Sequence, residues 1–263
     1  MIVYRNIECI AKFLSLIAFV PSLRYVISMG VDVMTIETLV NQPKTKRGKV
    51  TLQCILDAAA QVFYEKGYHG SSINDICQLA SIASGTFYIY FDSKYNLYKF
   101  MLLQVSRMIR KSMSRAIKDC TSRREAERVG LKAWLDFTRK NPYMYHIIWE
   151  SLYIDKQLFV DYYVNFCAAY SRRLIPAKES GEVRDIDTEV LSYVLMGASN
   201  FLGLNWGLFK EHENPDLDYV VDEFMKIIDN GIFTEKGLHE PDHAAGGKAA
   251  KPKLPRFRIE LDD

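Results

Sequence analysis

Residues 71–100, SSINDICQLASIASGTFYIYFDSKYNLYKF, decide the fold of this chain. Ser72 can cap the free N–H groups of a helix, and Asp75, three positions later, completes a capping box. The apolar positions that follow would form the buried face of this helix: Ile73, Ile76, Cys77 and Leu79. The pattern therefore predicts a short helix that ends near Ala80.

A turn over residues 80–83 separates this helix from a second short one, which Ser84 and Gly85 open. Asp92 and Ser93 then restart the chain as a longer helix. Two short helices around a tight turn, followed by a third, are typical of a helix-turn-helix module that reads DNA.

Over residues 48–100 the chain resembles the TetR family of bacterial transcriptional regulators. The resemblance lies in CILDAAAQVFYEKGYHGSSI (residues 54–73) and GTFYIYFDSKYNLY (residues 85–98). Two positions depart from the family pattern: Ser81 stands where glycine is usual in the turn, and Ile89 where an aromatic or polar residue is common.

The resemblance implies an all-α protein with an N-terminal three-helix DNA-binding domain and a larger helical domain for ligand binding and dimerisation. It also implies a function. We expect a homodimeric, ligand-responsive regulator, most often a repressor in this family, that binds a palindromic double-stranded operator and is released by a small effector.

A recognition helix projects short side chains into the major groove while neighbouring residues hold phosphates. Ser84 and Thr86 can hydrogen-bond bases or phosphates, and Gly85 permits a close backbone approach. The resemblance adds backbone contacts for Tyr88 and Lys94. The predicted DNA-binding residues are Lys46, Arg47, Lys49, Ser72, Ser84, Gly85, Thr86, Tyr88, Tyr90 and Lys94. Phe87 and Phe91 are expected in the core.

The charge distribution supports a DNA-binding head. The net charge is only +2, but residues 44–118 hold twelve Lys or Arg against four Asp or Glu. Lys44, Lys46, Arg47 and Lys49 would form a flexible basic arm before the first helix, either entering the minor groove or adding non-specific attraction. A basic face that is merely solvated is the structural alternative.

The chain divides into four predicted parts: residues 1–43 as a leader or extension, 44–94 as the DNA-binding domain, 95–235 as the helical body, and 236–263 as a disordered tail. Residues 7–29 are apolar, but Lys12, Pro21 and Arg24 interrupt them. Three interpretations stay open: a true start at Met29 or Met34, an extra amphipathic helix, or contact with a membrane surface.

Helical periodicity and caps predict helices over residues 51–65, 95–121, 123–139, 142–154, 157–178, 187–210 and 216–230. In the helix from residue 95, Leu97, Met101, Val105 and Met108 should point inward and Arg107, Arg110, Lys111 and Arg115 outward. The body is rich in aromatic residues, which predicts a pocket for a hydrophobic, aromatic or fatty-acyl effector. The candidate lining residues are Trp134, Phe137, His146, Trp149, Tyr162, Phe166, Tyr193 and Asn200.

Small residues in the segment 191–210 would let helices approach closely. With residues 216–230 this segment would pair with its copy as a four-helix dimer interface, as the resemblance also implies. The candidate interface residues are Gly197, Gly203, Gly207 and Phe224.

We predict no enzyme activity, because the predicted helices hold no Glu-x-x-His pair, and the sequence has no phosphate-binding glycine loop and no nucleophile placed beside a plausible base. No cofactor or metal is expected, although His239 and His243 lie four apart. The scattered cysteines fit a reduced, cytoplasmic protein, with a redox role for Cys120 or Cys167 as the alternative. A ligand-storage or membrane-associated helical protein is the rival function.

Overall fold

The computed structural model describes residues 39–210, 213 and 215–230. The predicted leader and tail, including residues 7–29 and the His239–His243 pair, therefore lie outside the described residues, except for the stretch 39–43. The chain divides into two compact units, Met1–Met225 and Lys226–Asp263, and only residues 226–230 of the second are described. The first unit holds both the helix-turn-helix and the helical body.

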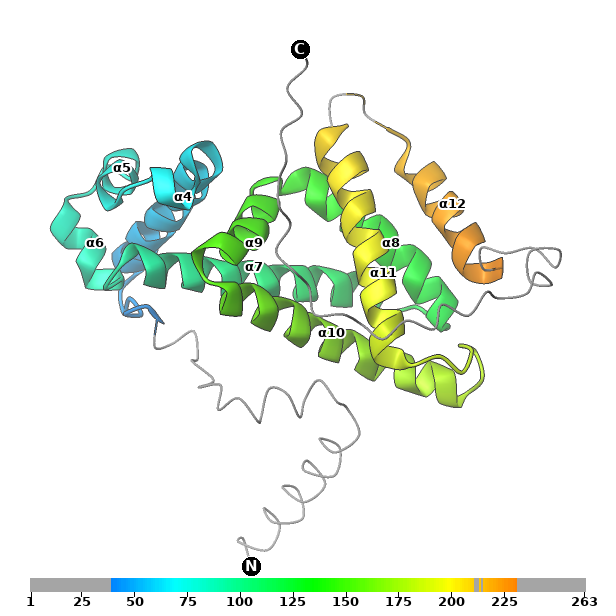
Figure 1. Ribbon diagram of the computed structural model, residues 1–263. Helices are drawn as coiled ribbons and strands as arrows, with labels where there is room; N and C mark the ends of the chain where they lie inside the picture. The colour runs from blue at the N-terminus through cyan, green and yellow to red at the C-terminus, as the bar shows by residue number, and fades with distance from the viewer. Residues whose placement is uncertain (1–38, 211–212, 214, 231–263) are drawn as a thin grey trace, which may run out of the picture. The chain divides into compact units, whose positions relative to one another are not determined.

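The described chain is helical, as the sequence predicts (Figure 1). Its elements are α4 (Lys46–Gly70), α5 (Ile73–Leu79), α6 (Ser84–Tyr90), α7 (Lys94–Ala116), α8 (Arg123–Lys140), α9 (Tyr143–Ile154), α10 (Lys156–Glu179), α11 (Thr188–Leu202), the π-helix η1 (Gly203–Phe209) and α12 (Leu217–Asn230). The predicted helix over residues 187–210 is thus two segments, α11 and η1.

The head is built from α4, α5 and α6, and its core is completed by the first turns of α7. Ile55, Ala59 and Phe63 on α4 are fully buried, as the apolar spacing predicts. Phe87, Phe91 and residues of α7 close the same core, with Phe91 and Phe100 in edge-to-face contact at 5.5 Å. These burials fix the position of α6 relative to α4.

Two expected core residues are exposed instead. Leu79, at the last position of α5, is 46% exposed, and Met108 on α7 is 40% exposed. The inward face of α7 is continued by Val105 and Ile109, so Met108 falls on the other side of the helix. The helical periodicity predicted for α7 is correct, but its fourth inward residue is Ile109 and not Met108.

The first helix also differs from its prediction. It begins at Lys46 rather than near residue 51, because the Thr45 hydroxyl accepts a hydrogen bond from the Gly48 N–H at 3.0 Å and caps it. Gly67 adopts φ 69°, which breaks the helical path at the position where the sequence predicts a glycine stop.

In the body α7 packs against α8 and α9, α10 packs against α9 and α11, and Figure 1 shows α11 crossing α8. The two glycines of η1 lie against α8, and α9 lies against α4 of the head. On its outer side α8 is joined to α12 by two ion pairs, Arg128–Asp222 at 2.5 Å and Lys132–Asp218 at 2.8 Å. The body therefore contacts the head through α9 and through the continuous helix α7.

Candidate DNA-binding surface and effector cavity

The capping box at the start of α5 forms as predicted. The Asp75 N–H donates to Ser72 Oγ at 3.1 Å, and the Ser72 N–H donates to Asp75 Oδ2 at 2.7 Å. Lys66 adds an ion pair to the other carboxylate oxygen at 2.6 Å. The hydrogen bonds from Lys66 and Ser72 hold the pKa of Asp75 well below its usual range. Ser72 is exposed and already committed to capping.

The turn between α5 and α6 places Ser81 in the left-handed region, with φ 54°. This conformation explains why glycine is the usual residue here, since a side chain at positive φ is strained. The Ile82 N–H returns to the Cys77 carbonyl at 3.0 Å and closes the turn. The angle between the two helices is therefore kept without glycine.

Helix α6 presents a polar outer face. Ser84 and Gly85 are exposed, Thr86 is partly exposed, and Tyr88 is 53% exposed, whereas Phe87 is fully buried beneath them. A Cβ atom at Gly85 would meet no atom within 4 Å, so internal packing does not require glycine there. A flat, small and hydroxyl-bearing surface of this kind fits against the edges of bases.

Tyr90 does not belong to this surface. Its side chain is only 7% exposed, and its hydroxyl donates to the Gly48 carbonyl of α4 at 3.1 Å. Tyr90 lies on the buried face of α6, which packs against α4, and not on the exposed face that carries Ser84, Gly85 and Tyr88. The predicted DNA contact for Tyr90 is therefore wrong, and the residue instead joins α6 to α4.

Lys94 has an internal role that the sequence did not predict. Its ammonium group donates to the backbone carbonyls of Tyr68 at 2.5 Å and Ser71 at 2.6 Å, and lies 4.3 Å from the centre of the Tyr68 ring. Burial lowers its pKa below the usual value. Lys94 thus stabilises the connection between α4 and α5 through these two carbonyls, and its side chain is only partly exposed.

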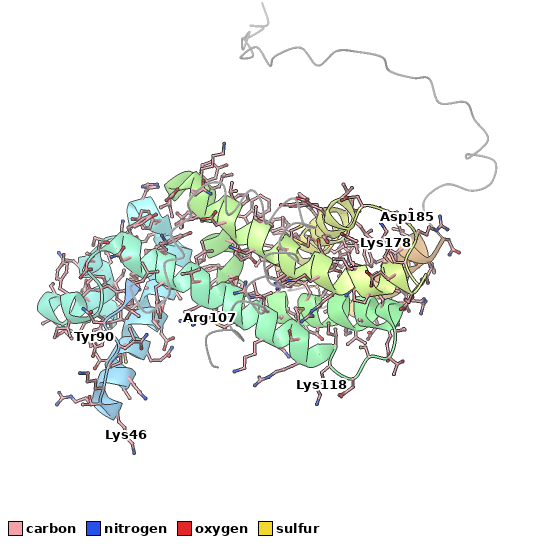
Figure 2. All side chains as sticks on the ribbon, turned by 90° about the horizontal axis from the view of Figure 1, so that it is seen from below. Lys46, Tyr90, Arg107, Lys118, Lys178 and Asp185 are labelled. Atoms are coloured by element: carbon pink, nitrogen blue, oxygen red, sulfur yellow. The ribbon has the colours of Figure 1, made fainter. Side chains whose placement is uncertain are left out.

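Three of the four basic residues around Gly48 are not part of a flexible arm. Lys46, Arg47 and Lys49 form the exposed first turn of α4, and only Lys44 precedes the helix. Figure 2 shows Lys46 projecting from this end of the head, with Tyr90 on the same side. These cations are therefore held at fixed positions beside α6.

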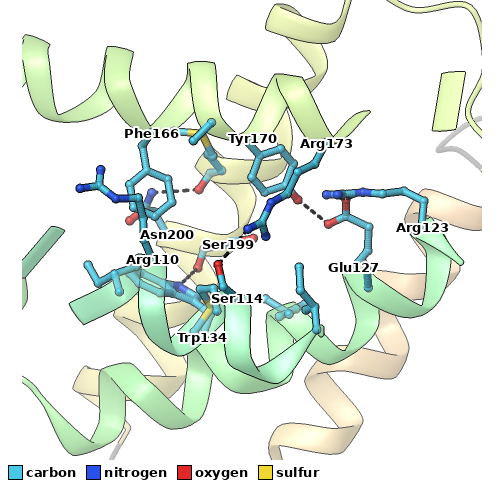
Figure 3. Close-up of a pocket in the computed structure, with 18 of the residues that line it drawn as sticks. Arg110, Ser114, Arg123, Glu127, Trp134, Phe166, Tyr170, Arg173, Ser199 and Asn200 are labelled. Atoms are coloured by element: carbon cyan, nitrogen blue, oxygen red, sulfur yellow. Dashed lines mark hydrogen bonds and ion pairs between the residues drawn. The ribbon is translucent and has the colours of Figure 1, made fainter. Parts of the chain in front are cut away.

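The body contains a largely apolar cavity of about 180 Å³, lined by α7, α8, α10, α11 and α12 (Figure 3). Four of the eight predicted ligand-binding residues line it: Trp134, Tyr162, Phe166 and Asn200. The other apolar walls include Ile109, Met113, Leu131, Met196 and Phe224. Burial raises the pKa of the lining Tyr163 to about 12, so its hydroxyl stays protonated.

The remaining four predicted residues do not line this cavity. The His146 ring packs against Tyr64 of α4 with centroids 4.6 Å apart, and Trp149 lies on Phe159 at 6.3 Å. Tyr193 is 41% exposed on α11, and Phe137 is partly buried on α8. Their aromatic character was a correct sign of packing, but it did not distinguish which face of each helix meets the cavity.

Sequence reasoning missed the charged groups of the cavity. Arg110, Arg123, Glu127 and Arg173 all line it, although Arg110 was expected to point outward. Arg110 is partly buried, and this burial lowers the pKa of its guanidinium. No local signal distinguishes these four residues, because each lies within three positions of another charged residue.

The cavity is connected to the start of the π-helix by two hydrogen bonds. Trp134 Nε1 donates to the Ser199 carbonyl at 2.8 Å, and the Tyr145 hydroxyl donates to the Asn200 carbonyl at 3.0 Å. Both carbonyls also accept from the backbone N–H of Gly203, the first residue of the π-helix. The two side chains therefore add a second donor to each carbonyl.

Two of the predicted dimer residues, Gly203 and Gly207, are buried within the chain. A Cβ at Gly203 would lie 2.7 Å from Trp134 Nε1, and one at Gly207 would collide with the Thr138 side chain. Phe224 is buried too, in the cavity wall. The close approach made by the two glycines is between η1 and α8 of one chain, so this packing does not require a second copy, and an interface role for Phe224 stays a prediction.

Gly197 is different, since a Cβ there would meet nothing within 4 Å. It lies on an exposed apolar face of α11, which we call the α11 face, formed by Val190, Tyr193, Val194, Gly197 and Phe201. Their spacing of three and four places them along one side of the helix. Val194 and Phe201 are 60% and 65% exposed.

Within the described residues, no helix is both long enough and apolar enough to cross a bilayer.

The comparisons with known proteins agree with this geometry. The family model "Bacterial regulatory proteins, tetR family" matches residues 55–100, which include α5 and α6. The chain is 28% identical over 100 residues to the HTH-type transcriptional activator FasR of Mycolicibacterium smegmatis, covering 38% of this chain and 46% of that protein. It is 50% identical over 52 residues to the regulator YvdT of Bacillus subtilis, covering 20% and 26%. The matches thus span less than half the length of these curated relatives.

Solved structures share the fold over a longer range. The fatty acid degradation regulator FadR of Bacillus halodurans superposes with a TM-score of 0.60 at 19% identity, covering 71% of this chain and 96% of that one. FadR of Bacillus subtilis, in complex with stearoyl-CoA, gives 0.59 at 20% identity, covering 69% and 100%. The family-model match is thus confined to residues 55–100, in the head, and these superpositions show that the fold is shared over a longer part of the chain.

Proposed function

We propose that this protein is a ligand-responsive transcriptional regulator that binds a palindromic operator as a homodimer. The observation that carries the proposal is the outer face of α6, where Ser84, Gly85, Thr86 and Tyr88 are accessible while Phe87 anchors the helix from beneath. Capping fixes α5, and the fixed cations of α4 flank the surface. In this arrangement α6 would read the major groove and Lys46, Arg47 and Lys49 would contact phosphates.

A homodimer would use the α11 face. Its apolar residues are exposed in the single chain, and burying them against a second copy would stabilise the pair. Because one recognition helix belongs to each copy, a dimer matches a palindrome with half-sites one helical turn or more apart. The division into a DNA-binding domain at residues 44–94 and a body at 95–235 is part of this proposal.

The cavity between α7, α8, α10, α11 and α12 would hold the effector. Its apolar walls favour a hydrophobic or aromatic compound, and the names of the FadR structures make a fatty-acyl compound a specific candidate. Ligand binding would change the position of the heads relative to one another and release the operator. A coupling of about 1–3 kcal/mol between the two sites would change operator occupancy enough for regulation.

We further propose that the protein acts in the cytoplasm, where its DNA lies, and that it is a repressor. FasR, the relative named as an activator, makes the direction of regulation a question for experiment. A reporter gene behind the operator should be silent when the protein is expressed and active after effector is added. Reporter activity that rises with the protein alone would instead identify an activator.

A gel-shift titration of the purified protein on the DNA upstream of its own gene tests DNA recognition. Excess unrelated DNA and two salt concentrations should be used, since basic surfaces bind DNA without specificity in low salt. A discrete complex that survives the competitor is expected. If a smear vanishes with competitor on this and on genome-wide selected fragments, specific DNA recognition is excluded.

A further inference from the structure

The effector cavity carries an unequal number of positive and negative charges. Its lining includes the guanidinium groups of Arg110, Arg123 and Arg173 but only one carboxylate, that of Glu127. Arginine stays protonated at neutral pH even when its pKa is lowered. The cavity lining therefore has two more positive charges than negative ones.

The Glu127 carboxylate accepts hydrogen bonds from two neighbouring side chains. Its Oε1 accepts a hydrogen bond from Arg123 Nε at 2.7 Å, and its Oε2 accepts one from the Tyr170 hydroxyl. The Arg123 guanidinium also lies 4.9 Å from the centre of the Tyr170 ring. This cluster, visible at one end of the cavity in Figure 3, pairs the negative charge of Glu127 with the positive charge of Arg123.

Arg110 and Arg173 are not neutralised in the described part of the chain. Arg110 is partly buried on α7, and no described carboxylate forms an ion pair with it. Arg173 on α10 donates to the uncharged Ser114 hydroxyl at 2.8 Å and remains largely exposed. A partly buried guanidinium without a counter-ion is unfavourable, and an anion in the cavity would remove that penalty.

The rest of the cavity requires a compact apolar group. The side chains of Ile109, Met113, Trp134, Phe166 and Met196 form most of its wall. Its volume of about 180 Å³ is close to that of apolar protein cavities that hold a benzene molecule. A ligand with a short aliphatic chain or a single ring matches this size.

We propose that the effector is a monocarboxylate with a compact apolar body, whose carboxylate is bound by Arg110, with Arg173 at the cavity mouth. The inference rests on the proposed function, because it assigns a ligand chemistry to the same effector cavity. The planar guanidinium can hold a carboxylate through two parallel hydrogen bonds. An alcohol of the same length would fill the apolar wall but leave both arginines uncompensated.

Isothermal titration of the full chain with octanoate, octan-1-ol and octylammonium tests this chemistry without DNA. Octanoate should bind about 10- to 100-fold more tightly than octan-1-ol, the range expected for hydrogen bonds to charged groups. Octylammonium should show no binding. Equal affinities for octanoate and octan-1-ol, or no heat from octanoate at millimolar concentration, would overturn the proposal.

Variants of the two arginines test which of them gives the preference for octanoate over octan-1-ol. Arg110→Gln should lose most of the octanoate affinity while keeping that for octan-1-ol, and Arg110→Lys should recover part of it. Arg173→Gln should cause a smaller loss. Arg115→Gln is the matched control, because Arg115 is exposed on α7 and lies outside the cavity lining. An unchanged octanoate preference in folded Arg110→Gln, checked by circular dichroism, would exclude Arg110 as the anion-binding group.

The proposed DNA-binding regulator and the proposed carboxylate site can be contradicted independently of one another. A gel shift without ligand measures operator binding, which the carboxylate site does not supply, and Arg115→Gln, outside the cavity lining, should leave it unchanged. Octanoate binding without any specific DNA complex would contradict the proposed regulator but support the carboxylate site. A specific DNA complex with no octanoate preference would retain the regulator and overturn the carboxylate site.

Discussion

The Glu150 carboxylate of α9 accepts a hydrogen bond from the backbone N–H of Tyr68 at 2.5 Å, which joins the body to the end of the first helix of the head. Its second oxygen is buried without a hydrogen-bond partner among the described residues. Lys94 holds the Tyr68 carbonyl from the other side. The chain between α4 and α5 is thus held by residues from both α9 and α7.

Glu150→Ala should therefore destabilise the protein by about 1–3 kcal/mol, because it leaves the Tyr68 N–H without its acceptor. Urea unfolding followed by circular dichroism measures the change. Glu65→Ala is the matched control, since Glu65 is exposed on α4 and bonds only to Gln61. Equal stability of the two variants would show that the contact with Tyr68 contributes nothing.

Gly67 meets the same carboxylate. A Cβ on Gly67 would lie 2.8 Å from Glu150 Oε1, and its φ of 69° disfavours any side chain. Gly67→Ala should cost about 1–3 kcal/mol for the backbone strain and more for the close contact. Gly181→Ala separates the two effects, since Gly181 has φ 79° but open space around it. Gly67→Ala should be the more destabilised variant in urea, and an equal or smaller loss than for Gly181→Ala would contradict the steric contribution of Glu150.

The glycines of the π-helix should be equally intolerant. Gly207→Ala places a methyl group against the Thr138 side chain of α8, which overpacks a buried contact and should cost about 1–3 kcal/mol. Gly197→Ala is the control, because its Cβ has open space within the chain. Thermal unfolding should show a lowered midpoint for Gly207→Ala alone. The same midpoint in both variants would disprove the close packing of η1 on α8.

Dimerisation through the α11 face should be sensitive to charge. Phe201→Glu places a carboxylate on the surface that two copies would bury, so sedimentation should shift from dimer to monomer at micromolar concentration. Phe209→Glu is the control outside the α11 face, on an equally exposed phenylalanine of η1. A dimer that persists in Phe201→Glu would place the interface elsewhere.

Thiol reactivity should follow burial. Burial raises the pKa of Cys77 and Cys167, so the reactive thiolate fraction at neutral pH is reduced and grows only as the pH rises. Iodoacetamide labelling of the native protein, read by peptide mass spectrometry, should modify the exposed Cys54 first. Burial and two nearby carboxylates also raise the pKa of Cys120. Fast labelling of Cys167 at neutral pH would revive the redox alternative.

The head could be predicted in detail because its signals are local. The capping box of Ser72 and Asp75, the helical break at Gly67 and the buried Phe87 all follow from residues a few positions apart. The roles of Tyr90 and Lys94 depend on partners 42 and 26 positions away, which no local pattern contains. Tyr90 is buried against α4, whereas a DNA contact of Lys94, which the family resemblance implies, stays a prediction beside its internal hydrogen bonds.

In the body, the sequence predicted the helices but not their facing sides. Trp134 and His146 look alike as polar-tipped aromatic residues, yet only Trp134 reaches the cavity. Small residues at Gly203 and Gly207 correctly indicated close helix packing, but the partner is α8 and not a second copy. The choice between internal and external contact depends on the tertiary arrangement of α8, α11 and η1.

The central claim is that the outer face of α6 reads DNA, and a fluorescence anisotropy titration on an operator fragment tests it most directly. The double variant Thr86→Ala and Tyr88→Ala should lose specific binding while remaining a folded dimer. Tyr153→Ala, at a 79% exposed tyrosine of the body, should bind as the unaltered protein does. Unchanged operator affinity in the folded double variant would contradict the assignment of α6 as the recognition helix.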